Sequence, residues 1–153
     1  MGTTFVHAKP HADAPGFWMR DSILELWLRL LALHIEDPAA PPTLATSIRD
    51  RWLLASRGYF NGCVPHRLDE AVATPEGEAI IRAAIHSLLK SLAKAPVDLG
   101  PEVLNLMGFN GGEFVGRMET WRLVEVGQAF LGLLDGTVGE SASSTAFMPG
   151  SSR

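Results

Sequence analysis

Apolar side chains return every three or four residues along most of this chain, and strict alternation of apolar and polar residues never lasts beyond a few positions. Returns at that spacing line one face of a helix, whereas alternation is typical of a half-buried strand. The ten Pro and fifteen Gly are clustered, which leaves long windows without Pro. The pattern therefore predicts helices and supports no strand.

The first predicted helix covers residues 22–35, capped by Asp21 or Ser22 and stopped before Pro38. Its polar residues form one narrow stripe, and apolar residues cover nearly all the rest of its surface. Such a helix is either central in the core or shared with a partner. A place on a membrane surface is disfavoured because the polar face is not basic.

Three more helices follow from the same periodicity, together with a short one. The second ends at Gly58, a residue suited to a left-handed helix terminator. The third begins where Thr74 offers a cap and Pro75 takes the first helical position. In chain order, the predicted ranges are residues 44–57, 75–94, 101–107 and 113–134.

The last predicted helix contains three glycines, Gly116, Gly127 and Gly132. Each glycine inside a helix costs about 1 kcal/mol relative to Ala. We therefore expect another helix to approach this one closely, and the first helix is the candidate neighbour.

Together these elements predict an all-α protein, a single-domain helical bundle of four main helices plus one or two short helices. The length of 153 residues suits one domain with one core, which we place over residues 17–137. Residues 1–16 carry no helical stripe and predict a flexible N-terminal tail. The Ser-rich residues 138–153 predict a disordered C-terminal tail.

Charge and cysteine content narrow the functional classes. Thirteen Lys and Arg against 17 Asp and Glu give a net charge of −4, whereas binding to a phosphate backbone draws on a basic face. Nucleic acid is therefore not an expected partner. No run of about 18 apolar residues is free of charge, and no basic start leads into an apolar run. With a single Cys, which rules out an internal disulfide framework, these features favour a cytoplasmic protein that does not bind membranes.

The motifs of several common enzyme families are absent. They are the zinc-protease pattern H-E-x-x-H, the serine-hydrolase elbow G-x-S-x-G and the phosphate loop G-x-x-x-x-G-K-[ST]. No catalytic residue is named on this basis, and neither a cofactor nor a metal is expected. An enzyme is the less favoured class, although catalytic groups often meet only in space.

Two smaller groups have the chemistry of metal ligands or nucleophiles. His7 and His11 are four residues apart, but Pro10 lies between them, so incidental tail histidines are the favoured interpretation. Cys63 and His66 have the chemistry of a nucleophile pair or of half a zinc site. Because Cys is among the most buried residue types, we expect Cys63 to be packed and inert.

The segment of residues 49–70 combines arginines with interleaved aromatic residues. Loops carry binding residues more often than core elements do, and a guanidinium group matches carboxylate and phosphate. The alternative is that the aromatic residues plug the core while the arginines pair with acidic residues elsewhere. If the segment binds a ligand or a partner, the candidate residues are Arg49, Arg51, Arg57, Tyr59, Asn61, His66, Arg67 and Asp69.

Three hypotheses for function remain. The leading one is a non-catalytic protein-interaction or self-associating module, which binds a protein partner or forms a homo-dimer, because the first helix is so apolar and Trp is a favoured interface anchor. The alternative is an enzyme or small-ligand binder with a pocket for a polar or anionic ligand near residues 49–70. There, Asp69 or Glu70 would act as a base if burial raised its pKa. The third is a structural subunit of a larger assembly.

Overall fold

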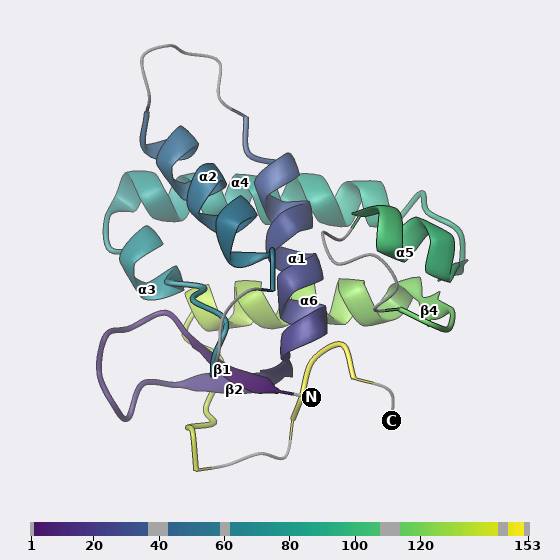
Figure 1. Ribbon diagram of the computed structural model, residues 1–153. Coiled ribbons are helices and arrows are strands. Elements are labelled where there is room, and N and C mark those ends of the chain that lie inside the picture. Colours follow the sequence, from purple (N-terminus) through teal and green to yellow (C-terminus); the bar gives the residue numbers. More distant parts are fainter. Residues whose placement is uncertain (1, 37–42, 59–61, 108–113, 144–146, 152–153) are drawn as a thin grey trace.

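A computed structural model describes residues 2–36, 43–58, 62–107, 114–143 and 147–151. Its helices are α1 (Asp21–Leu33), α2 (Leu44–Ala55), α3 (Leu68–Ala71), α4 (Pro75–Leu92), α5 (Pro101–Met107) and α6 (Thr120–Leu134). Helix α1 crosses in front of α4 and α6, which pack against each other (Figure 1). Helix α2 packs along α1, so the helices form two crossed layers.

Two small antiparallel sheets accompany the helices, so the all-α prediction is wrong and the fold is a helix-dominated mixture of helices and strands. One sheet pairs β1 (Thr3–His7) with β2 (Gly16–Arg20). The other pairs β3 (Asp98–Leu99) with β4 (Met118–Glu119). The larger sheet lies across one end of α1 (Figure 1).

Sequence patterns missed the first hairpin because its strands are short and one of them hides its alternation. In β2, Phe17 and Met19 are buried while Trp18 faces outward, so both faces carry apolar side chains. Strand β1 lies within residues 1–16, where a tail was predicted, and its Val6 is fully buried. A strand receives its hydrogen bonds from another segment, so five residues of local pattern do not reveal it.

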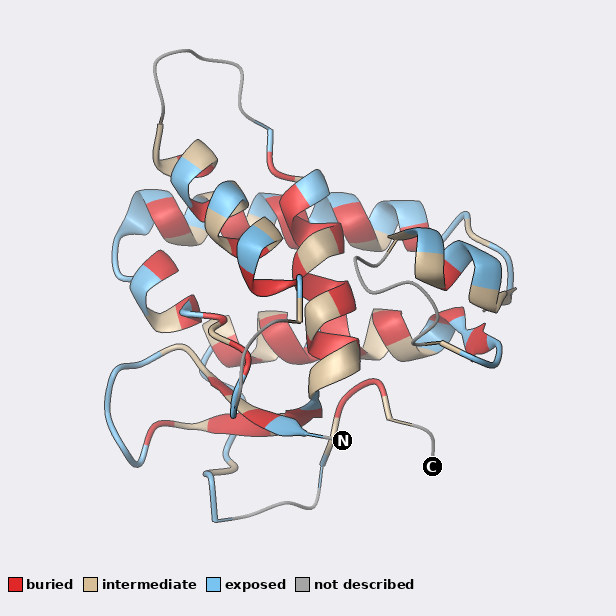
Figure 2. Cartoon of the chain, in the orientation of Figure 1, coloured by how far each residue is buried: buried red, intermediate tan, exposed pale blue. Residues whose placement is uncertain are grey.

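Helix α1 is central in the core rather than free for a partner. Its buried residues, which Figure 2 shows in red, are Ile23, Leu24, Leu26, Trp27, Leu28, Leu30, Leu31 and Ala32. The sequence left open whether this helix lies in the core or is shared with a partner, and the structure supports a place in the core. Neither α1 nor any other helix within the described ranges has the length and apolar character needed to cross a membrane.

Helix α4 starts as its capping residues predict, whereas α1 starts at Asp21 without the predicted side-chain cap. The Thr74 side chain accepts a hydrogen bond from the Gly77 N–H at 3.1 Å, and Pro75 occupies the first position of α4. Helix α2 starts behind a capping box in which Thr43 and Thr46 bond each other's backbone N–H groups. Helix α5 has the predicted bounds.

Helix α6 begins later than predicted, because the residues before it pair as β4, and Gly116 therefore lies outside the helix. The expected close approach is confirmed at Gly127. A Cβ there would lie 2.6 Å from Leu89 Cδ2 of α4 and 3.0 Å from Trp27 Cη2 of α1. Gly127 thus allows α6 to contact both helices.

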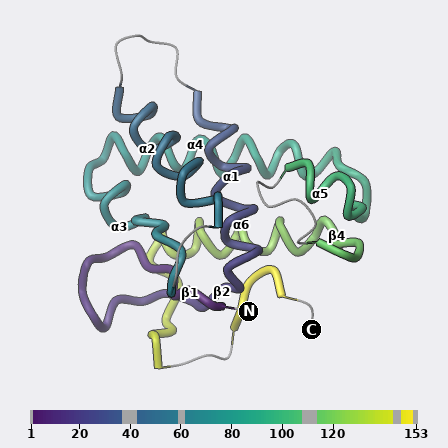
Figure 3. The backbone as a smooth tube through the Cα atoms, viewed as in Figure 1, coloured from purple at the N-terminus to yellow at the C-terminus, as the bar shows by residue number. Residues whose placement is uncertain are grey.

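The C-terminal residues contact the hairpin and α6 (Figure 3). The Trp18 indole donates a hydrogen bond to the Ala142 carbonyl at 3.0 Å. The Arg122 guanidinium donates to the Gly150 carbonyl at 2.6 Å. The division of the chain into one domain with two tails stays a prediction.

Candidate functional site

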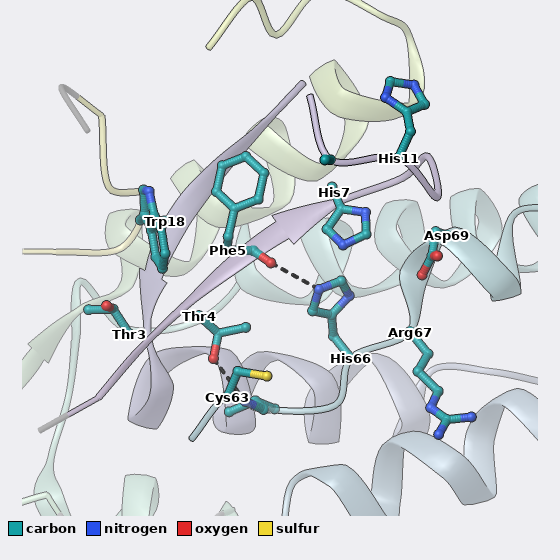
Figure 4. Close-up of a pocket in the computed structure, with 12 residues that line it drawn as sticks. Thr3, Thr4, Phe5, His7, His11, Trp18, Cys63, His66, Arg67 and Asp69 are labelled. Carbon is teal, nitrogen blue, oxygen red and sulfur yellow. Dashed lines mark hydrogen bonds between the residues drawn. The ribbon is translucent and has the colours of Figure 1, made fainter. Parts of the chain in front are cut away.

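A cleft of about 450 Å³ opens between the outer face of the β1–β2 hairpin and the connector, which we define as residues 62–67 between α2 and α3 (Figure 4). It contains residues from both ends of a chain segment of more than sixty residues, brought together by the fold. The lining residues are Thr3, Thr4, Phe5, His7, His11, Ala12, Trp18, Cys63, Val64, His66, Arg67 and Asp69.

One wall of the cleft is a row of rings, which we call the ring row: Trp18, Phe5, His7 and His66. Strand alternation places Phe5 and His7 on the same face of β1, and Trp18 pairs with Phe5 across the hairpin. Adjacent ring centroids lie 5.4 Å apart for Trp18 and Phe5, 6.1 Å for Phe5 and His7, and 5.3 Å for His7 and His66. Trp18, Phe5 and His7 are half-buried, so each of these residues keeps part of its surface open to solvent.

His66 joins the two walls of the cleft. Its Nδ1 accepts a hydrogen bond from the Leu68 N–H at 3.0 Å, because a backbone amide can only donate. Its Nε2 must therefore carry the proton, and it donates to the Phe5 carbonyl at 3.1 Å. The Trp52 indole donates to the His66 carbonyl at 2.7 Å, which holds the backbone of this residue in place.

Burial keeps the His66 imidazole neutral. His66 is 6% exposed, and desolvation lowers its pKa from 6.5 to about 4, with a smaller contribution from the nearby His7. The hydrogen bond to Phe5 and the charge of Asp69 act in the opposite direction but are weaker. His66 is therefore a neutral structural group at neutral pH.

Arg67 has an unusual backbone conformation at the edge of the cleft. Its φ of 46° is the sole positive value among non-glycine residues in the described ranges. A non-glycine residue held in this region carries strain, and such residues cluster at functional sites. Its side chain extends away from the rings (Figure 4) and lies 3.6 Å from the Glu70 carboxylate. Asp69 lines the cleft on the same side.

The structure brings together some of the residues predicted from the sequence and separates others. His66, Arg67 and Asp69 line the cleft. The Arg51 guanidinium instead donates to Glu70 at 3.1 Å, and Arg49 lies 3.6 Å from Asp50. The remaining predicted arginine, Arg57, is exposed and does not line the cleft. Tyr59 and Asn61 lie outside the described residues.

Several residues of the cleft were missed. Phe5 and Trp18 belong to the hairpin, whose alternation is too short to stand out. Cys63, expected to be packed, is exposed and free instead. Its position in the connector is decided by chain geometry rather than by the average burial of its residue type.

The cleft is suited to a flat organic group rather than to a metal ion. Both nitrogens of His66 are already engaged, and no group of three potential metal ligands was found in the parts of the chain that the structure describes. Half-buried aromatic residues favour stacking or edge contacts with a flat group instead. Compared with known proteins, the chain matches no family model, no curated protein and no solved structure.

Proposed function

We propose that this protein binds a small, planar aromatic molecule, which stacks on the ring row in the cleft. The observation that carries this proposal is the row of four rings along an open cleft of about 450 Å³. Small-ligand sites are concave, mainly apolar and furnished with a few polar groups. The cleft has these properties: its surface is mainly apolar, and Asp69 and Arg67 stand at its edge as polar groups.

The charge at the cleft favours a ligand with a polar edge over a strongly anionic one. One cation, Arg67, and one anion, Asp69, line the cleft, and Arg67 points away from the rings. Arg49 and Arg51, which an anion site would need, lie near acidic side chains. The proposal concerns binding alone and includes no reaction.

The test compares aromatic amides with their saturated counterparts, because the two differ in planarity but share the amide group. We expect benzamide or indole-3-carboxamide to shift the NMR signals of Phe5, His7, Trp18 and His66 in a saturable way. Cyclohexanecarboxamide should bind about tenfold more weakly, since it cannot stack. Equal affinity for flat and saturated amides, or shifts elsewhere in the molecule, would contradict the proposal.

Matched tryptophan variants localise the binding. Trp18→Leu removes one ring of the row and should weaken binding of the aromatic amides. Trp121→Leu removes an exposed ring on α6, outside the residues that line the cleft, and should leave binding unchanged. If both variants bind as the wild type does, the ring row is not the binding surface.

A second candidate function is self-association through the end of the molecule formed by β3, α5, β4 and the start of α6. Among the described residues, five of the eight large apolar side chains that are exposed lie there: Val97, Val103, Leu106, Val115 and Trp121. Arg117 pairs with Asp98 at this end. Because a two-fold dimer would bury this same apolar end of both copies, a second copy of the chain is the proposed partner.

Sedimentation over a range of concentrations tests the second candidate. Leu106 is 82% exposed on α5, and Leu54 is 54% exposed on α2. If the wild type forms dimers, Leu106→Lys should abolish them and Leu54→Lys should not. A wild type that stays monomeric at every concentration removes this candidate.

We also propose a cytoplasmic location. Its support is that Cys63 is free and exposed, a state that the reducing cytosol preserves. Nucleic acid and membranes are not among the proposed partners.

A further inference from the structure

The hairpin and the connector are joined through one imidazole, which bonds a backbone group on each side. His66 lies between the Phe5 carbonyl of β1 and the Leu68 N–H at the start of α3, as Figure 4 shows for the first of these bonds. The side chain of Leu68 is fully buried. The Leu68 amide is therefore shielded from water for as long as the imidazole stays in place, which protects this amide from exchange.

We propose that His66 is an acid-released latch: protonation of its imidazole breaks its bond to the Leu68 N–H, and the rotation that follows draws Nε2 away from the Phe5 carbonyl of β1. The second proton can only go to Nδ1, because Nε2 already carries one. It would then face the Leu68 N–H, and two donors cannot share a hydrogen bond. The protonated ring must rotate away from Leu68, which opens the wall of the cleft.

The groups around His66 determine how firmly the latch is closed. From β1, the His7 ring meets His66 edge-on, so a positive charge on both rings would be repulsive. From α3, Asp69 favours the charged form, and Arg67 and Cys63 from the connector and His11 from the hairpin turn line the same cleft. Helix α2 contributes the neutral indole of Trp52. Burial outweighs these groups and lowers the pKa of His66 to about 4, so the latch is closed at neutral pH.

Two bonds of Thr4 limit the movement. Its hydroxyl is bonded to Asp21 and to the Val64 N–H, and neither bond involves His66. The opening is therefore limited to the contacts of His66 with Phe5 and with Leu68, and it leaves the core of the hairpin in place. This inference needs no ligand, so it stands or falls separately from the proposed binding of aromatic molecules.

Hydrogen exchange of the Leu68 amide measures the opening directly. The open state takes up a proton with the ordinary pKa of 6.5 and the closed state with a pKa of about 4. Between these values, the protection of the Leu68 amide, corrected for its intrinsic exchange rate, should fall about tenfold for each unit by which the pH is lowered. Protection that does not change across this range would overturn the proposal.

Two variants identify the group responsible. His66→Asn keeps an acceptor near the Leu68 N–H but has no group that titrates here, so the decline in protection should disappear. His7→Gln removes the neighbouring imidazole and should retain the decline. If His66→Asn retained it, another group would be the cause and the latch would be rejected.

The nitrogen shifts of histidine-labelled wild type give a second measurement that needs no variant. They should show the Nε2–H tautomer at neutral pH and a transition at the same pH as the loss of Leu68 protection. Transitions at different pH values would contradict the latch.

Discussion

The hydroxyl of Thr4 accepts a hydrogen bond from the Val64 N–H at 2.8 Å, across 60 residues of sequence. The same hydroxyl donates to the Asp21 carboxylate at 2.7 Å, and Thr4 is 2% exposed. One buried side chain therefore connects the first strand to the connector and to the start of α1. Both walls of the cleft depend on this contact for their relative position.

Thr4→Val should destabilise the protein by about 1–3 kcal/mol, because it keeps the shape but leaves the Val64 N–H without its acceptor. The free energy of unfolding in urea measures the effect. Thr3→Val, in the exposed neighbouring residue, is the control and should cost little. Equal losses in the two variants would show that the hydroxyl of Thr4 contributes no special stability.

Gly127→Ala should also destabilise, by about 1 kcal/mol. The new methyl group gains helix propensity but meets the rigid, fully buried Trp27 ring and Leu89 at distances that force a shift. Gly116→Ala is the comparison, because a Cβ there meets no atom within 4 Å among the described residues. Thermal unfolding of both variants is the measurement, and a stabilised Gly127→Ala would show that Leu89 and Trp27 yield easily.

Cys63 should react with a thiol reagent in the folded protein at close to the rate seen in denaturant, because it is exposed. A buried thiol would react only after opening. The single Cys makes the reading unambiguous. An aromatic amide bound in the cleft should slow the reaction, since Cys63 lines that cleft. A thiol that reacts only in denaturant would contradict the described connector.

The global stability should depend on pH through His66. Its folded pKa of about 4 lies below the ordinary 6.5, so between these values the unfolded chain binds more protons. The free energy of unfolding should therefore fall as pH falls through this window, by about 3 kcal/mol in total. Above the window, His66 should cause no change of stability with pH. Urea titrations of the wild type and His66→Asn give the difference. A His66→Asn variant with the same decline would assign the effect to carboxyl groups.

Helices were predictable where their own residues supply the signal. Thr74 and Pro75 start α4 by local chemistry, and apolar residues at helical spacing identified α1 and α2. The start of α6 was placed too early. Met118 pairs with Leu99 in a small sheet, so the helix can begin only after this strand, and the pairing depends on a distant segment. The candidate arginines were also predicted from neighbouring residues in the sequence alone, and Arg51 contacts Glu70 rather than the cleft.

By itself, the sequence determined where the main helices lie and that they share a buried core, because periodicity and caps act within a few residues of each other. Only the tertiary structure decided that Phe5, Trp18 and His66 share a cleft. Strand pairing, ring contacts and the burial of an imidazole each need partners from distant parts of the chain. A local sequence pattern does not indicate which distant residues those partners are.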